Sequence, residues 1–224
     1  DAAAAEGVRL VVPDRPGYGR STSPPRGWSW NDWRNDLHEL LDTEGIDQAP
    51  LVGFSGGGPF ALAAADGDRT PRVGLISSVI PPSRNGLALL SRIPFALQQL
   101  FRLSKPIARI GGPEALARQY TSKSVSSATA TEISKEFQGS LRQGPAAVTR
   151  ETRLFASESS RFDSPPPEVP VRAWHGTRDT ITPLGPVRSF LQGHDADGTL
   201  VSTRSDHFGT LLDRRREVFE WASR

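Results

Sequence analysis

The sequence has 224 residues, of which 36% are hydrophobic and 21 are glycine, a composition typical of one folded domain with its own core rather than of a disordered chain. The 27 basic and 25 acidic residues nearly balance, whereas a nucleic-acid-binding domain is usually more basic. There is no cysteine, which excludes disulfides, thiolate nucleophiles and cysteine-ligated metal clusters, and no apolar run approaches the roughly 18 residues that span a membrane. We expect a cytoplasmic location.

The first predicted strand lies near the amino terminus. Residues 8–14 form a short β-branched run that is too apolar for a surface strand, and this pattern predicts a strand covered on both faces in a parallel sheet. Residues 1–7, a run of alanines followed by Gly7, are typical of the last turn of a helix and its glycine stop. The sequence therefore opens within a helix and continues into a buried strand.

A helix and two further strands follow. Ser29 and Asp32 match the S-x-x-D capping signature that opens a helix, and Gly45 ends it. The apolar face of this helix consists of Trp33, Leu37, Leu40 and Leu41. The next predicted elements are a strand at 49–54, a helix at 55–65 and a strand at 72–78. This alternation predicts an α/β fold with a mostly parallel sheet and right-handed crossovers.

Residues 81–165 break the alternation, because they contain helix-like stretches and no good strand. The later elements are strands at 169–174 and 199–203, a helix near 187–192 and a final helix around Leu211 and Phe219. We therefore predict an α/β core made of residues 1–80 and 166–224, into which residues 81–165 are inserted as a helical cap. The proline-rich segment 164–167 marks the carboxyl border of this insertion.

A glycine-rich turn joins the strand at 49–54 to the helix after it. Its sequence, Gly53-Phe54-Ser55-Gly56-Gly57, is G-x-S-x-G in the strand–turn–helix setting of a nucleophile elbow. Such a sharp turn forces the serine into a strained conformation, and glycines two residues to either side avoid side-chain clashes. The serine oxygen then stands clear at the carboxyl edge of the sheet. The backbone N–H of Gly56, at the start of the helix, can donate to an oxyanion.

A serine hydroxyl is a weak nucleophile without a neighbouring base, so this hypothesis requires a histidine and a carboxylate. Asp179 follows the strand at 169–174, and His207 follows the last predicted strand. The order serine, aspartate, histidine is that of one known class of serine hydrolases. Asp206 is the main competitor of Asp179 as the carboxylate partner of His207. The remaining histidines are predicted to be structural: His38, His175 and His194.

Several blocks together resemble the α/β-hydrolase fold family, specifically its capped esterase-like and haloperoxidase-like members. The blocks are residues 14–21 (DRPGYGRS), which resemble the family's D-R-P-G-x-G-x-S turn, residues 53–58, which resemble its elbow, residues 175–183, which resemble its H-G-x-x-D-x-x-x-P acid loop, and His207, which resembles its terminal histidine. The resemblance spans nearly the whole chain and puts residues 81–165 in the position of the variable cap.

The resemblance implies a mechanism. Ser55 attacks an ester-like carbonyl, His207 takes its proton and returns it to the leaving group, and Asp179 holds the imidazole tautomer, with Gly56 at the oxyanion. Haloalkane dehalogenases and epoxide hydrolases of this kind have an aspartate in place of Ser55, so these two chemistries are disfavoured. We expect a serine hydrolase of a small ester, lactone or similar acyl substrate that uses no metal and no organic cofactor.

Other functions are less well supported by the sequence. Gly17-Tyr18-Gly19 lacks the third glycine of G-x-G-x-x-G, and no G-x-x-x-x-G-K-[ST] motif occurs, which disfavours a dinucleotide site and a P-loop. A catalytically silent hydrolase fold that serves as a small-molecule receptor or interaction module would keep the same residues. That alternative stays open.

Segment 84–123 contains seven basic residues, one acidic residue and interleaved apolar positions. Basic amphipathic segments dock on membranes in some proteins. The favoured interpretation is a cap whose apolar face covers the active site while its arginines remain in water. We expect a small-molecule acyl substrate as the partner, no nucleic acid, and membrane contact only as the minor alternative.

The resemblance also implies that the fold is incomplete at the amino terminus. In the family, further strands precede the one expected at residues 8–14, and one of them ends in an H-G loop that supplies a second oxyanion N–H. The sequence has no such loop before residue 8 and no methionine. We expect an N-terminally incomplete hydrolase that is inactive or poorly folded alone.

Overall fold

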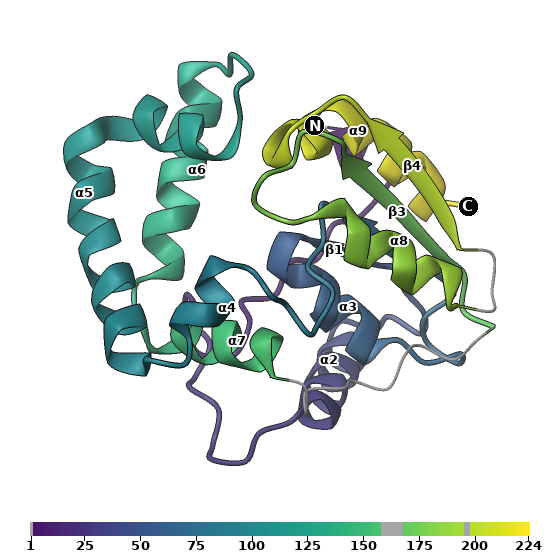
Figure 1. Cartoon of the computed structure of the whole chain (residues 1–224). Helices are drawn as coiled ribbons and strands as arrows, with labels where there is room; N and C mark the ends of the chain where they lie inside the picture. The colour runs from purple at the N-terminus through teal and green to yellow at the C-terminus, as the bar shows by residue number, and fades with distance from the viewer. Residues whose placement is uncertain (1, 158–167, 195–197) are drawn as a thin grey trace. The chain divides into compact units, whose positions relative to one another are not determined.

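Four short parallel strands form one sheet in the computed structural model, which describes residues 2–157, 168–194 and 198–224. In spatial order the strands are β1 (Leu51–Phe54), β2 (Val73–Ile76), β3 (Val171–Gly176) and β4 (Thr199–Thr203). The register aligns Gly53 with Leu75, and Leu75 with Ala173. Because all four strands run parallel, their carboxyl ends lie at one edge of the sheet (Figure 1). The predicted α/β class and the four later strands are confirmed.

Helices cover both faces of this sheet. The helices concerned are α3 (Gly58–Ala64), α8 (Leu184–Gln192) and α9 (His207–Ala222). Leu75 packs with Leu62 of α3 and Val187 of α8, whereas its neighbour Ile76 packs with Val218 of α9. Successive side chains of a strand point to opposite faces, which explains this division. Figure 1 shows α8 and α9 on opposite sides of the strands.

The helix predicted from the capping signature is α2 (Trp30–Thr43). The Ser29 hydroxyl accepts from the Asp32 N–H, and the Asp32 carboxylate accepts from the Ser29 N–H at 2.7 Å, which completes a capping box. The hydroxyl and the N–H of Ser29 both donate to this carboxylate and hold the pKa of Asp32 below its ordinary value. Trp33 is buried, and its indole N–H donates to the Phe60 carbonyl of α3 at 2.9 Å. The predicted start of this helix is confirmed.

The contacts within the chain define two compact units. The first comprises Asp1–Leu10, Gly27–Ile80 and Phe162–Arg224, and the second comprises Val11–Arg26 and Pro81–Arg161. The first unit holds the sheet and also a short helix, α1 (Ala2–Ala5). The predicted cap at residues 81–165 remains a proposal about the role of the second unit. Its proline-rich border at 164–167 lies outside the described residues.

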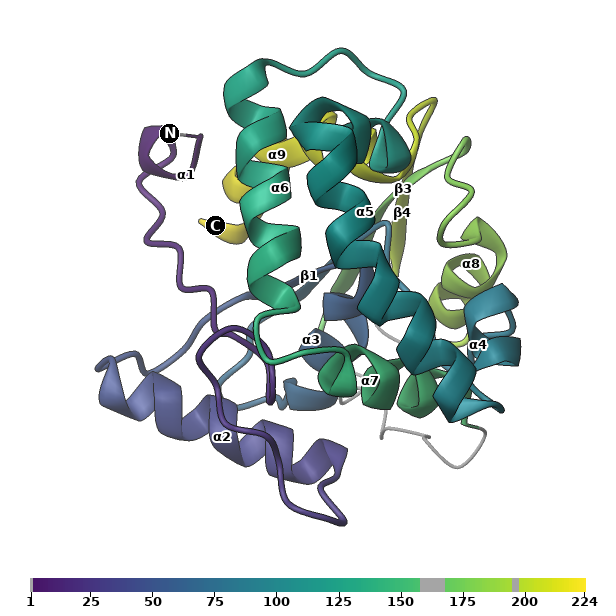
Figure 2. The same cartoon turned by 90° about the vertical axis from the view of Figure 1, so that its left-hand side faces the viewer.

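The second unit is helical between β2 and β3. Its helices are α4 (Gly86–Leu90), α5 (Pro94–Tyr120), α6 (Ser127–Ser140) and α7 (Ala146–Ala156). Helices α5 and α6 run side by side in both views (Figures 1 and 2). Helix α5 bends at Gly112, whose φ of 77° is not helical, directly before Pro113.

Residues 11–26 belong to the helical unit because a buried carboxylate holds them there. The Arg15 guanidinium donates to both carboxylate oxygens of Glu151 in α7, at 2.6 and 3.1 Å, and the Tyr18 hydroxyl donates to the same carboxylate at 2.7 Å. Burial, together with the charge of Glu151, raises the pKa of Tyr18. The sequence places all of residues 1–80 in the core, and this network is the physical reason that the structure groups them differently.

The prediction of a strand at residues 8–14 is wrong. The structure describes all of these residues and assigns none of them to a strand, and Leu10 and Val12 are 60% and 77% exposed. A β-branched run becomes a strand only when a neighbouring strand supplies partners for its backbone N–H and C=O groups. None of the four described strands pairs with this segment.

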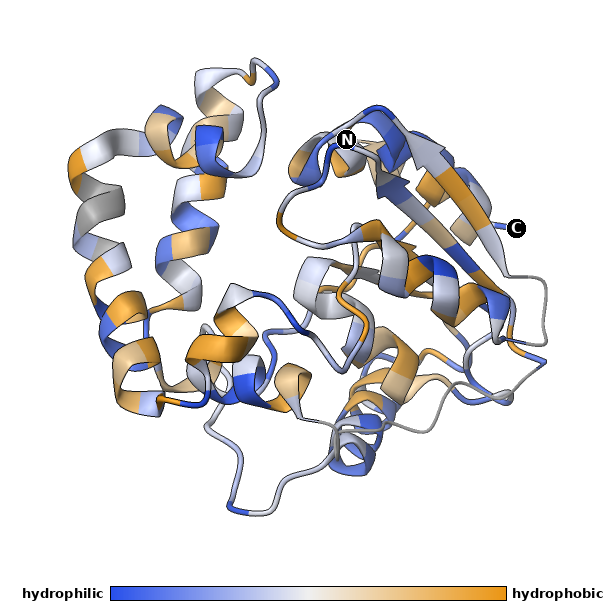
Figure 3. Cartoon of the chain, viewed as in Figure 1, coloured by the Kyte–Doolittle hydropathy of each residue, from blue (hydrophilic) through white to orange (hydrophobic). Residues whose placement is uncertain are grey.

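Hydrophobic side chains are exposed on the first helices of the second unit. Figure 3 shows α4 as largely hydrophobic, and Leu89 of α4 and Phe95 of α5 are 65% and 72% exposed. Among the described residues, no helix combines the length and the hydrophobicity that crossing a membrane requires.

Candidate active site

Ser55 directly follows β1 in a strained turn. Its φ is 53°, a left-handed conformation that is uncommon for residues other than glycine, and it opens the short 3-10 turn Ser55–Gly57. Its carbonyl accepts from the Val79 N–H at 3.0 Å. The predicted elbow geometry is therefore present at Ser55.

The glycines around Ser55 differ in what they permit. A Cβ atom on Gly53 would lie 2.5 Å from the carbonyl oxygen of Gly57, so Gly53 is required by a close backbone approach. A Cβ on Gly57 would meet nothing within 4 Å, whereas one on Gly58 would lie 1.6 Å from the Ser78 hydroxyl oxygen. The prediction that Gly57 is required to avoid a side-chain clash is therefore wrong. The glycine that avoids such a clash on this side of Ser55 is Gly58.

Asp179 lies in the loop that follows β3, with its side chain fully buried. One carboxylate oxygen, Oδ1, accepts from the backbone N–H groups of Ile181 and Thr182, both at 2.9 Å. The other oxygen, Oδ2, lies 2.8 Å from the Thr182 hydroxyl and 2.8 Å from His207 Nδ1. Four polar groups therefore surround this carboxylate and fix its orientation.

The environment of Asp179 keeps its carboxylate ionised. Burial by itself raises the pKa of a carboxyl group, but the bonds from His207 and from Thr182 stabilise the charged form and outweigh burial. The result is a pKa of Asp179 well below its ordinary value. A carboxylate that stays charged can stabilise positive charge on the neighbouring imidazole.

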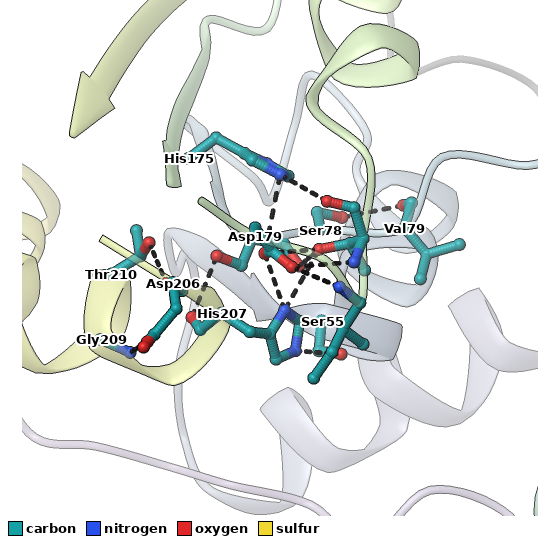
Figure 4. A network of polar contacts seen from close by, with 12 residues as sticks. Ser55, Ser78, Val79, His175, Asp179, Asp206, His207, Gly209 and Thr210 are labelled. Carbon is teal, nitrogen blue, oxygen red and sulfur yellow. Dashed lines mark hydrogen bonds and ion pairs between the residues drawn. The ribbon is translucent and has the colours of Figure 1, made fainter. Parts of the chain in front are cut away.

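His207 begins α9 and is 3% exposed. Its Nε2 lies 2.9 Å from Ser55 Oγ, while its Nδ1 lies 2.8 Å from Asp179 Oδ2 (Figure 4). The Phe54 ring packs against the imidazole with 5.0 Å between ring centroids. The structure thus brings together the three residues that the sequence singles out: Ser55, Asp179 and His207.

Asp206, the alternative carboxylate partner for His207, instead caps a helix. Its side chain accepts from the Gly209 N–H at 2.8 Å and caps the amino terminus of α9. Figure 4 shows the Asp206 side chain directed along the helix end, while Asp179 faces the imidazole of His207. The geometry therefore favours Asp179 as the partner of His207.

Gly56 is the second residue of the 3-10 turn that leads into α3. The first N–H groups of a helical segment have no carbonyl partner within the segment. This position next to Ser55 is compatible with the oxyanion role that the sequence predicts for the Gly56 N–H.

His175 lies in β3 beside this group and is fully buried. Its Nε2 is 2.9 Å from the Thr182 carbonyl oxygen, which can only accept, so Nε2 carries a proton. Burial lowers the pKa of His175, and a lowered pKa favours the neutral ring. Nε2 also lies 3.7 Å from Asp179 Oδ2 (Figure 4).

The other histidines and the early turn contact different groups. His38 Nε2 lies 3.0 Å from Asp66 Oδ2, and His194 Nε2 lies 3.0 Å from the Val169 carbonyl. In the turn at 14–21, Asp14 accepts from the Arg20 N–H at 2.9 Å, a contact internal to the turn. Among the described residues, no group of three or more histidine, aspartate or glutamate side chains could hold a metal ion.

Two further buried residues, which no sequence motif marks, contact Asp179 and His207. Thr182 follows Asp179 by three positions, and Ser77 follows β2 at the same carboxyl edge of the sheet. The Ser77 hydroxyl donates to the carbonyl of His207 at 3.1 Å. The available signal is weak, because it consists only of hydroxyl side chains placed just after strands.

This arrangement defines the class of α/β hydrolases. It has a serine on an elbow after one strand, an aspartate after a later strand and a histidine after the last strand. All three lie at the carboxyl edge of a parallel sheet. Comparison with known proteins agrees with this class. The chain belongs to the Alpha/beta hydrolase family, whose family model matches residues 1–221. Membership in this family indicates a hydrolytic enzyme.

Individual relatives are distant. The AB hydrolase superfamily protein YisY from Bacillus subtilis is 23% identical over 228 residues, which covers 95% of this chain and 79% of that protein. An α/β hydrolase fold protein from Nakamurella multipartita has a TM-score of 0.65 and 22% identity, with 99% of this chain and 85% of that one covered. The enol-lactonase from Burkholderia xenovorans LB400 has a TM-score of 0.59 and 19% identity, with 92% and 76% covered. At these identities the structural likeness supports the fold.

Proposed function

We propose that this protein is a serine hydrolase that cleaves a small ester, lactone or similar acyl substrate. The observation that carries the proposal is the hydrogen-bonded line from Ser55 Oγ to His207 Nε2 at 2.9 Å and from His207 Nδ1 to Asp179 Oδ2 at 2.8 Å. Family membership supports hydrolytic chemistry. The enol-lactonase among the structural neighbours supports an ester-type bond as the target.

Acylation follows from the proton positions in this line. A carboxylate only accepts, so Asp179 selects the tautomer with a proton on Nδ1 and leaves Nε2 of His207 free to accept. The Ser55 hydroxyl gives its proton to Nε2 as its oxygen bonds to the substrate carbonyl carbon. The carbonyl oxygen becomes an oxyanion, to which the Gly56 N–H donates. The charged Asp179 stabilises the imidazolium that forms.

Release of the products reverses these roles. The imidazolium of His207 gives its proton to the leaving oxygen as the carbon–oxygen bond breaks, and the acyl group remains on Ser55. Water then gives a proton to Nε2 and attacks the acyl carbon, and the second collapse returns the proton to Ser55. The proposed reaction uses no metal and no organic cofactor.

Substrate selection is assigned to the second unit. In this proposal residues 81–165 act as a cap whose apolar side chains, such as Leu89 and Phe95, shape the range of acyl groups accepted. Exposed apolar side chains without a partner are typical of surfaces that meet a ligand or another apolar face. The fold alone does not specify a substrate.

A fluorophosphonate probe tests the proposal directly, because it reacts with a serine that a neighbouring base activates. In the full-length protein we expect labelling and p-nitrophenyl acetate hydrolysis, and neither in its Ser55→Ala variant. The matched control is Ser202→Ala, which removes an exposed serine of β4 and should leave both readings unchanged. A folded full-length protein that is not labelled and does not turn over esters would support the receptor or interaction module instead.

A further inference from the structure

Thr182 makes more contacts with the proposed catalytic residues than any motif predicts. It is 2% exposed, in the loop between β3 and α8. Its N–H donates to Asp179 Oδ1 at 2.9 Å, and its carbonyl oxygen lies 2.9 Å from His175 Nε2. Its hydroxyl oxygen lies 2.8 Å from Asp179 Oδ2 and 3.2 Å from His207 Nδ1. The hydroxyl therefore stands where the carboxylate meets the imidazole.

The single proton of this hydroxyl has two acceptors within reach. One is Asp179 Oδ2 at 2.8 Å, and the other is the Ser77 carbonyl oxygen at 3.0 Å. A bond to an ionised acceptor is stronger than one to a neutral carbonyl, and it is also the shorter one here. The proton therefore goes mainly to Asp179. That bond and the bond from His207 Nδ1 share the same carboxylate oxygen.

Ser77 contacts both Thr182 and His207. It is fully buried with a φ of 42°, which is unusual for a residue other than glycine. Its carbonyl faces the Thr182 hydroxyl at 3.0 Å, while its own hydroxyl donates to the His207 carbonyl at 3.1 Å. One strained residue after β2 thus contacts both the acid loop and the start of α9. Strained residues persist only where the surrounding structure holds them in place.

We propose that Thr182 is a positioning residue for the Asp179–His207 pair, and that its hydroxyl holds Asp179 Oδ2 in line with the imidazole. Ser77 anchors the hydroxyl from the opposite side. This inference rests on the proposed function, since it concerns how the acid and base are oriented. Within the described part of the chain, the other titratable side chain placed against the pair is His175 of β3, which donates to the Thr182 carbonyl and not to the carboxylate.

Two variants separate the hydroxyl from the rest of the side chain. Thr182→Val keeps the branched shape and removes the hydroxyl, whereas Thr182→Ser keeps the hydroxyl. The matched control is Thr180→Val, which makes the same change at an exposed threonine of the same loop. Each variant is made in the full-length protein and assayed with p-nitrophenyl acetate for kcat, KM and the pH dependence of kcat/KM, and Ser55→Ala sets the background.

We expect Thr182→Val to lower kcat about tenfold with little change in KM, which corresponds to losing roughly one hydrogen bond to a charged group. With one donor fewer, the carboxylate holds the proton of His207 more strongly. The acid limb of kcat/KM should therefore move to higher pH. Thr182→Ser should restore both readings, and Thr180→Val should match the wild type.

The outcomes are distinguishable. If the wild type shows no turnover above Ser55→Ala, the proposed function fails. If the wild type is active and Thr182→Val retains its kcat and its acid limb, the positioning role is overturned. A lower kcat with an unmoved acid limb, or no recovery in Thr182→Ser, also overturns it, because a packing defect alone would give that result. If Thr182→Val does not fold, Thr182→Ala removes the hydroxyl without adding volume and is judged by the same criteria.

Discussion

Gly176 and Ser205 touch where the end of β3 meets the loop before α9. A Cβ atom on Gly176 would lie 2.1 Å from the Ser205 carbonyl oxygen and 2.7 Å from the Thr210 hydroxyl oxygen. The Arg178 N–H donates to the same Ser205 carbonyl at 3.1 Å. Since Ser205 precedes His207 by two residues, glycine at position 176 allows the histidine to reach its place beside Asp179.

Gly176→Ala should therefore displace His207. We expect a loss of about 10²-fold in ester turnover, because shifts on the order of 1 Å at a catalytic group have that effect, together with a lower Tm. The control is Gly185→Ala in α8, where an added Cβ meets nothing within 4 Å. Its Tm should hold or rise. Wild-type kinetics in Gly176→Ala would contradict this role.

The three proposed catalytic residues should act as one unit. We expect Ser55→Ala and His207→Ala each to lower kcat by several orders of magnitude. The double variant should lower kcat little further than either single variant does. Asp179→Asn should also be severe, because an amide can present its NH₂ group to the imidazole and stabilise the wrong tautomer. Additive losses in the double variant would count against a shared mechanism.

Stability should fall on acidification in two separate windows. Burial lowers the pKa of His175 from 6.5, so below that pH the unfolded chain binds a proton that the folded protein does not, and the free energy of unfolding decreases. The lowered pKa of Asp179 adds a second loss that begins only near 3.8. His175→Gln should make the free energy of unfolding depend less on pH in the first of these two ranges. Urea unfolding between about pH 7.5 and 5.5 measures it, and equal slopes in both proteins would refute the assignment.

The Arg15–Glu151 pair should stabilise the helical unit. Glu151→Gln removes the charge that two side chains share, and we expect a loss of roughly 2–3 kcal/mol, at the low end for a buried pair because the Arg15 side chain is 30% exposed. Tyr18→Phe removes a single hydrogen bond and should cost less. Glu132→Gln, in an exposed pair with Lys135, should change little, as thermal unfolding of all three variants will show.

The exposed apolar side chains of α5 should affect selectivity more than stability. Phe95→Ala and Leu103→Ala, at positions 72% and 57% exposed, should change the ratio of kcat/KM between short-chain and long-chain p-nitrophenyl esters severalfold. Their stability should change by no more than about 0.5 kcal/mol. Val52→Ala, at an exposed position of β1, is the control.

The membrane alternative predicts a different result for the same surface. It requires sedimentation with anionic vesicles that Arg92→Glu and Arg102→Glu abolish. If the ratio of kcat/KM between the two esters stays unchanged and such sedimentation is observed, a membrane-docking surface would be supported instead of a cap.

Signals within a few residues were sufficient for much of the fold. The capping box at Ser29, the short apolar strands and the glycine-rich turn at Ser55 each depend on neighbours along the chain, and the structure has all of them. The segment at 8–14 has an equally strong local pattern and forms no strand, because a strand also needs a partner from elsewhere in the chain.

The family, the four strands after residue 48, and Ser55 and His207 of the candidate site could be predicted from the sequence, because each leaves a pattern in neighbouring positions. Three features are visible only in the folded chain: Asp179 rather than Asp206 faces His207, Thr182 and Ser77 contact this pair, and Arg15 pairs with Glu151. These contacts join positions 28, 105 and 136 residues apart. No local propensity encodes such a distance, because it is set only when the sheet and its helices have brought the chain segments together.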